Sequence, residues 1–303
     1  MGVKLLLRAH PQKGGAGPAH HELIKRVLDE LCCSLVRSDS WSVSCNLMKQ
    51  GHGVVGSMGG PAAAGGGSSG LLRDMWAVAF RDSPELVYLL VRPEFKALEC
   101  DIRMVRLIEK KLEYAKQMTV RLEGSTYTKG DLTLRLCAAT QAIHSTQALL
   151  GYCLDLEYAP VSAMGAADGL VSEFVELLRQ QLQLAGAAAA AAGGGALPGL
   201  QLEVIRPAFE KYGLMGQPYG RTHAAVAYND LVVAMISSSA AAAQQAQQQT
   251  AAAAAQQAQQ TQAAAGAATA AGTAAAQQGQ AVPGQGAGGQ PHAVHVKHQP
   301  IAR

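Results

Sequence analysis

The sequence predicts an α+β fold in which an antiparallel, barrel-like sheet of about eight strands has flanking helices and is followed by a disordered Ala/Gln-rich tail. Apolar and polar residues alternate with period two in segments joined mostly by hairpin-length links. Helical segments occur at intervals and do not alternate strictly with strands. Residues 240–303 are mainly Ala, Gln, Gly and Thr, with only Lys297 and Arg303 as fixed charges. Such strands hide their edges best by curling into a barrel or a strongly bent sheet.

The first elements are a strand over 3–10, an amphipathic helix over 18–36 and a strand over 41–48. The helix places apolar residues at spacings of three and four, with Pro18 near its start. Strands then follow at 75–80, 85–91 and 94–100. Asp101 is expected to cap a helix that ends at about residue 117.

The second half begins with a hairpin of strands 118–124 and 131–137, whose turn chemistry is supplied by Lys129, Gly130 and Asp131. A strand at 152–160 alternates Leu154, Leu156 and Tyr158, expected to face inward, with Asp155 and Glu157, expected to face outward. The last elements are a helix over 168–184, a strand over 199–207 and a helix over 222–236 with Thr222 as its cap.

Low-complexity stretches set the expected domain organisation. Residues 1–239 form a single barrel-like domain with loop insertions at 56–70 and 185–199, and residues 240–303 form a disordered tail. These stretches lack the large apolar residues that would offset the entropy of ordering.

Charge and cysteine usage exclude several classes of protein. Because two of the 25 Lys and Arg residues lie in the tail, residues 1–239 carry 23 cationic against 22 acidic residues. This balance argues against a dedicated nucleic-acid-binding domain, which would cluster its cations. The six cysteines form no C-x-x-C pair, so a structural zinc site has little support. No secretory leader or long apolar segment is evident, and we expect no membrane span.

A glycine pattern, G-x-G-x-x-G at residues 51–56, follows the strand at 41–48 and has the spacing of a dinucleotide-binding loop. The required helix does not follow, because residues 56–70 are rich in Gly with Pro61 among them. The acidic residue expected about 20 positions later is also misplaced, since Asp74 precedes the next strand. We therefore interpret the loop as a spacer and expect no cofactor.

Paired carboxylates are the strongest catalytic signal. Glu99 with Asp101, and Asp155 with Glu157, lie two residues apart and would share one face of a strand. Inside a barrel such groups could hold a divalent cation for phosphate chemistry. The alternation favours a solvent-exposed face instead. The further basic and acidic residues that would line the inside of such a barrel are not evident. The scattered histidines fit no hydrolase or zinc pattern, and the tail segment 292–298 (HAVHVKH) is at most an adventitious metal binder. We expect no catalytic or metal-binding residues.

A possible contact surface lies in residues 205–220, which are rich in turns. Phe209, Tyr212, Leu214, Met215 and Tyr219 are the aromatic and large apolar residues of this segment. Such residues are enriched at the centres of interfaces. They could equally seal one end of the sheet before the last helix, and periodicity does not distinguish the two interpretations.

The order of segments resembles a known family. GVKLLLRAHP, LVYLLVRPEFKALECD, LEGSTYTKGDLTLRL, LDLEYAPVS, SEFVELLRQQL and FEKYGLMGQPYGRTHAAVAYNDLV occur in this order. Together they resemble subunit 20 of the Mediator transcription coactivator, in its plant-type form, over most of residues 1–184 and 200–236. The Gly/Ala loops and the tail depart from that pattern at places where an insertion is tolerated.

The resemblance implies a non-enzymatic, nuclear protein with a barrel-like α+β fold. It also implies a place in the Mediator head module, chiefly with subunit 18 and near subunit 8, bridging regulators to RNA polymerase II. Direct sequence-specific binding of nucleic acid and attachment to membranes are not expected. Because the fold is similar to that of metal-dependent RNA triphosphatases, the alternative is a tunnel-type phosphohydrolase that uses Glu99, Asp155 and Glu157.

Overall fold

The structure is a computed structural model that describes residues 2–11, 16–31, 33–50, 74–163, 165–191 and 199–276. The chain divides into two compact units, Met1–Ala242 and Ala243–Arg303. In the second unit, residues 243–276 are the continuation of the last helix. The domain boundary at 239, the two insertions and the disorder of the tail stay predictions.

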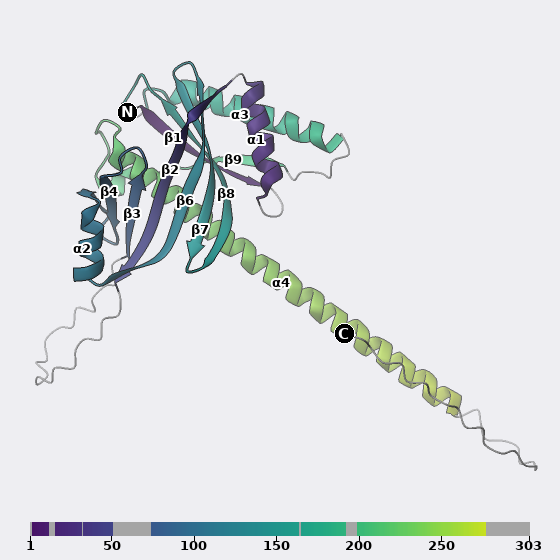
Figure 1. Cartoon of the computed structure of the whole chain (residues 1–303). Coiled ribbons are helices and arrows are strands. Elements are labelled where there is room, and N and C mark those ends of the chain that lie inside the picture. The colour runs from purple at the N-terminus through teal and green to yellow at the C-terminus, as the bar shows by residue number, and fades with distance from the viewer. Residues whose placement is uncertain are drawn as a thin grey trace, which may run out of the picture. The chain divides into compact units, whose positions relative to one another are not determined.

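The first unit contains one large antiparallel sheet with helices on both faces (Figure 1). In chain order the elements are β1 Val3–Pro11, α1 Pro18–Glu30, β2 Ser34–Gln50, β3 Asp74–Phe80, β4 Leu86–Val91, β5 Lys96–Asp101, α2 Arg103–Lys111, β6 Tyr114–Lys129, β7 Leu132–Ile143, β8 Thr146–Tyr158, α3 Asp168–Ala191, β9 Leu200–Val204, a 3-10 turn Phe209–Tyr212 and α4 Arg221–Ala276.

The strand order confirms the α+β class and corrects the barrel. Over the described residues the sheet runs β5-β4-β3-β2-β6-β7-β8-β1-β9, so β5 and β9 are its two ends and the sheet is not closed. The chain joins neighbouring strands by hairpins at β3–β4, β4–β5, β6–β7 and β7–β8. The N-terminal strand β1 lies between β8 and β9, both antiparallel to it.

Helices cover the two faces of the sheet unequally. The start of α4 packs on one face, where Trp41, Val43, Leu122 and Tyr228 belong to the largest apolar cluster. On the other face, α1 and α3 cover the β7–β8–β1–β9 end of the sheet, and α2 covers the β2–β5 end. Strands β1 and β8 are therefore buried on both sides, between α4 and the α1–α3 pair.

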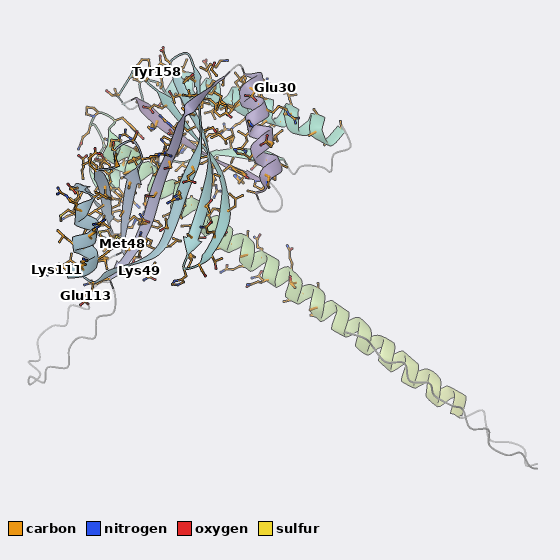
Figure 2. The ribbon with its side chains drawn as sticks, in the orientation of Figure 1. Glu30, Met48, Lys49, Lys111, Glu113 and Tyr158 are labelled. Atoms are coloured by element: carbon orange, nitrogen blue, oxygen red, sulfur yellow. The ribbon has the colours of Figure 1, made fainter. Side chains whose placement is uncertain are left out.

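The predicted C-terminal ends of the first two helices were wrong. The helix expected to reach residue 36 ends at Glu30, and residues 34–36 instead pair with β6. The helix expected to reach about 117 ends at Lys111, because Tyr114 onward pairs with β2. Figure 2 shows Met48 and Lys49 close to Lys111 and Glu113 at this end of the sheet.

The ends of the last two helices also differ from the sequence-based expectation. Helix α3 continues to Ala191, into the segment expected to be a loop from 185, and residues 192–198 lie outside the described residues. Helix α4 begins at Arg221, which places Thr222 inside its first turn. Gly220 precedes the helix, and its N–H donates to Nδ1 of His223 in the first turn at 3.2 Å. His20 accepts the Gly17 N–H at 3.2 Å in the same way at the start of α1.

The first 35 residues of α4, Arg221–Ala255, have a window of mean hydropathy 1.3 and are long enough to cross a membrane. Half of that window is buried inside the protein, where Val226, Tyr228, Leu231 and Val232 pack on the sheet. Core helices of soluble proteins share this length and composition, so the feature is weak support for a span.

Candidate functional site

The predicted contact residues at 205–220 mostly lie in the core. Tyr212, Leu214 and Tyr219 are buried, and Phe209 is half-buried against the same cluster. Met215 is 61% exposed. The aromatic rings pack on one another and on α4, with the Tyr219 ring stacked on His223 at 5.2 Å between centroids and the Phe209 ring edge-on to His223 at 5.3 Å. The segment therefore seals one end of the sheet, and its role as an interface stays a prediction.

Of the four carboxylates considered for catalysis, only Asp155 and Glu157 come together, where both contact Lys4 and Arg135. Glu99 is exposed on the end strand β5. Asp101 is the last residue of β5, and its Oδ1 accepts the Arg103 N–H at 2.8 Å. The residue at the N-cap of α2 is Ile102, so the expectation that Asp101 caps this helix was wrong by one position. Hydrogen bonds from the Arg103 side chain and backbone lower the pKa of Asp101 to about 2. Asp155 and Glu157 lie on β8, next to α4.

Asp155 is fully buried, so the expectation that it faces solvent was wrong. It lies under α4 in a cluster of charged groups that we call the buried ion cluster, made of Lys4, Arg135, Asp155, Glu157 and Tyr228. Sequence reasoning missed Lys4 and Arg135. They occupy the strands on either side of β8, where Lys4 pairs with Glu157 and Arg135 pairs with Asp155 in the strand register.

The cluster is closely connected. Lys4 Nζ lies 3.0 Å from Asp155 Oδ2 and 3.1 Å from Glu157 Oε2. Arg135 Nη1 lies 2.8 Å from Asp155 Oδ2 and 3.0 Å from Glu157 Oε2. From α4, the Tyr228 hydroxyl donates to Asp155 Oδ2 at 2.6 Å. Two cations thus balance two carboxylates across β1, β7 and β8, and one hydroxyl connects these three strands to the helix.

Electrostatics keeps these groups charged although they are buried. Burial favours the neutral form of Asp155, but Lys4, Arg135 and the Tyr228 hydroxyl outweigh it and hold the pKa of Asp155 below its ordinary value. Glu157 follows the same pattern, with its pKa lowered mainly by Lys4 and Arg135 against burial. Burial and the Asp155 charge raise the pKa of Tyr228, so that its hydroxyl remains a donor.

The arrangement is suited to holding α4 on the sheet. Both carboxylates are engaged by cations, and a divalent ion would have to displace Lys4 and Arg135 to bind them. Within the described part of the chain, no group of three His, Cys, Asp or Glu side chains is placed to hold a metal ion. The glycine pattern at 51–56 and the histidines at 292–298 lie outside the described residues.

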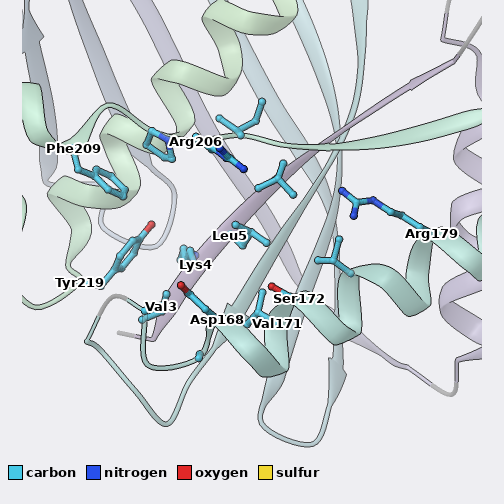
Figure 3. Close-up of a pocket in the computed structure, with 16 residues that line it drawn as sticks. Val3, Lys4, Leu5, Asp168, Val171, Ser172, Arg179, Arg206, Phe209 and Tyr219 are labelled. Carbon is cyan, nitrogen blue, oxygen red and sulfur yellow. The ribbon is translucent and has the colours of Figure 1, made fainter.

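A cavity of about 530 Å³ lies beside this cluster, between β1, α3 and the segment after β9 (Figure 3). Val3, Leu5, Val171 and Phe209 supply much of its apolar wall. Its polar residues are Lys4, Asp168, Ser172, Arg179, Arg206 and Tyr219. The Tyr219 side chain is 4% exposed, and its hydroxyl points toward the cavity without a hydrogen-bond partner among the described residues.

Comparison with known proteins gives one sequence relative. Mediator of RNA polymerase II transcription subunit 20b from Arabidopsis thaliana is 27% identical over 156 residues, which cover 52% of this chain and 65% of the relative. The match thus spans a little less than two thirds of the relative's length. No family model matches the chain.

Solved structures give weaker likenesses. A Pyrococcus horikoshii OT3 protein, PH1012, is 14% identical with a TM-score of 0.33, over 59% of this chain and 90% of that chain. The Schizosaccharomyces pombe Mediator head module gives 10% identity and a TM-score of 0.28, over 62% and 94%. A Vibrio parahaemolyticus protein proposed to be an adenylate cyclase gives 9% and 0.30, over 61% and 90%. TM-scores this low carry no argument about fold or activity. The sequence relative confirms the resemblance: over 156 residues the chain is similar to subunit 20b of the Mediator complex.

Proposed function

We propose that the chain is a non-enzymatic subunit of the Mediator coactivator, which bridges regulators to RNA polymerase II through protein–protein contacts in the head module. The observation that carries the proposal is the match to Mediator subunit 20b. The partners proposed with it are chiefly subunit 18, with subunit 8 nearby. A subunit of the RNA polymerase II transcription machinery works in the nucleus, which is where we place the protein.

The surface supports a role in binding other proteins. Large apolar side chains are exposed on β5 and around α2, namely Leu98, Ile102, Met104, Leu107 and Leu112. Leu170, Leu177 and Leu184 are exposed on α3 at seven-residue spacing. Grouped exposed apolar residues of this kind mark surfaces that other proteins cover.

The buried ion cluster argues against the tunnel-type phosphohydrolase. A metal-dependent phosphohydrolase needs carboxylates free to coordinate the ion and room for the phosphates. Asp155 is fully buried and bound by Lys4, Arg135 and Tyr228, whereas Glu99 lies far along the sheet on its end strand. These positions separate Glu99 from Asp155 and Glu157, whose oxygens are already bound by Lys4 and Arg135.

Co-expression of the full chain with Mediator subunit 18 from the same organism tests the proposal. Size-exclusion chromatography with light scattering is expected to show a stable 1:1 complex. A well-folded chain that elutes alone would contradict the proposal. Release of phosphate from triphosphate RNA that depends on Mg²⁺ or Mn²⁺ would establish the enzyme instead, and we expect none above a protein-free control.

A further inference from the structure

The end strand β9 adjoins hollows in the described surface. Three cavities adjoin it, of about 530, 830 and 580 Å³, and Val204 and Arg206 line all three. The first opens toward α3 and contains Tyr219. The third opens toward α4 and contains Tyr212 and Asp230. The second follows the edge of β9 itself, between Arg8 and His10 of β1 and Arg179 and Gln183 of α3.

The backbone of β9 presents free hydrogen-bonding groups along this edge. The Ile205 N–H donates to Leu6 O at 2.9 Å, and in an antiparallel ladder every second residue bonds to the same neighbour. Residues 201 and 203 therefore bond to β1, while Leu202 and Val204 point their N–H and C=O outward. Among the described residues only one of these outward groups has a partner: Leu202 O accepts from Arg179 Nη2 at 3.1 Å.

Each of the three cavities is lined by a side chain that has a buried polar atom without a partner. Tyr219 lines the first and Tyr212 the third, both with an unpaired hydroxyl, and the two residues are 4% and 9% exposed. His10, with an unpaired Nδ1, lines the second. None of these atoms has a hydrogen-bond partner among the residues that the structure describes. A buried polar group left unpaired is costly, so these atoms mark places where another molecule can supply the partner.

Charge defines the chemistry of that molecule. The residues lining the three cavities include six cations, Lys4, Arg8, Arg92, Arg179, Arg206 and Lys211, against three carboxylates, Asp168, Glu203 and Asp230. Lys4 is neutralised inside the buried ion cluster, Arg8 pairs with Glu203 and Arg92 pairs with Asp230. Arg206 is exposed and forms no ion pair within the described part of the chain. The excess of positive charge favours an acidic partner.

We propose that β9 is the docking edge for an extended acidic segment of the Mediator partner, which adds to the sheet as a further strand. This inference rests on the proposed function. Side chains of an added strand alternate between the two faces of the sheet. One set enters the cavity with Tyr219 and the other the cavity with Tyr212, where each hydroxyl donates to an acceptor of the segment. A carboxylate of the segment pairs with Arg206.

Hydrogen exchange of the full chain, alone and in complex with Mediator subunit 18, tests the docking edge. The amides of Leu202 and Val204 exchange freely in the chain alone and are protected in the complex. Complex formation without protection of these two amides would overturn the strand and leave the proposed function standing. No complex at all would overturn both.

Three variants locate the contact. Val204→Pro removes an outward N–H and no bond to β1, so it is expected to weaken the complex about tenfold or more while the chain stays folded. Val204→Ala is its control and binds nearly as well as the wild type. Tyr219→Phe is expected to leave the stability of the free chain unchanged and to weaken binding about two- to tenfold. Wild-type affinity for both Val204→Pro and Tyr219→Phe would refute the proposal.

Arg206→Glu tests the acidic character of the segment. It is expected to weaken binding, with the difference from wild type shrinking at high salt, because charge reversal at an exposed site is screened. Arg26→Glu, an exposed cation on α1, is the matched control and leaves binding unchanged. Equal effects of the two reversals would show that only overall charge matters and would reject the specific contact with Arg206.

Discussion

Replacing Asp155 by alanine removes the carboxylate that three groups of the buried ion cluster share. The Asp155 side chain is 0% exposed and accepts from Lys4 at 3.0 Å, Arg135 at 2.8 Å and Tyr228 at 2.6 Å. In the variant, two cations would face Glu157 alone in a site that little water reaches. Breaking a buried ion pair in this way costs about 3–5 kcal/mol of unfolding free energy.

The Tyr228 hydroxyl would also lose its acceptor, at a cost of about 1–3 kcal/mol for an unpaired buried donor. The two costs do not add fully, because Glu157 still binds Lys4 at 3.1 Å and Arg135 at 3.0 Å. We therefore expect Asp155→Ala to lower the unfolding free energy by about 3–5 kcal/mol in total.

Urea denaturation of the full chain, followed by tryptophan fluorescence, measures this change, since the Trp41 ring packs against the Tyr228 ring at 5.5 Å between ring centroids. Glu173→Ala, an exposed carboxylate on α3, is the matched control and is expected to change the free energy by less than about 0.5 kcal/mol. A loss of under about 1 kcal/mol for Asp155→Ala would refute the argument, because it would mean that the cluster is solvated or that its charges are not coupled.

Four further predictions concern the same core. Tyr228→Phe is expected to cost about 1.5–3 kcal/mol, since it removes a hydrogen bond to a charged acceptor, while Tyr219→Phe costs nothing measurable; chemical denaturation of both checks this. The pKa of Asp155 and the pKa of Glu157 lie below their ordinary values, so the stability that they contribute is present above about pH 4 and falls as the pH drops further; urea midpoints across this range should fall less in Asp155→Asn. Gly124→Ala would place its Cβ 1.8 Å from Leu136 O across the β6–β7 pair and is expected to cost about 1–3 kcal/mol, measured by thermal unfolding. Millimolar Mg²⁺ or Mn²⁺ is expected to shift the wild-type Tm by less than about 1 °C, since an ion that bound the folded state would raise it.

The elements that the sequence predicted well are those in which apolar and polar residues alternate regularly. Strands at 75–80 and 85–91 and the hairpin around Gly130 are present as expected, because their alternation and turn residues are local signals. The helices that ran too far, past Glu30 and past Lys111, did so because their last residues pair with distant strands. Tertiary pairing overrode local propensity at both places.

The buried ion cluster could not be read from β8 alone. Apolar and charged residues alternate along β8, which is typical of a strand with one solvent-exposed face. This strand instead has a helix on each face. The available signal lay on other strands: Lys4 in β1 and Arg135 in β7 carry charges opposite to those of β8. Only the strand register, which the sequence does not reveal without the topology, brings them opposite Glu157 and Asp155.

The cluster also explains why we expect partner proteins to bind at the edges of this sheet. The face that a tunnel enzyme would leave open holds α4, with Tyr228 bonded to Asp155 and its ring packed on Trp41 and Phe80. A helix of small apolar residues such as Ala224 and Ala225 could pack on an apolar sheet in several registers, because neighbouring methyl groups make equivalent contacts. A single buried hydroxyl bonded to a single carboxylate removes that freedom, because any other register leaves the Tyr228 hydroxyl buried without its acceptor. With its interior fixed in this way, the protein offers partners its surface and its two free strand edges. Of those edges, β9 adjoins the three cavities with unpaired polar atoms, and it is the one we expect a partner to cover.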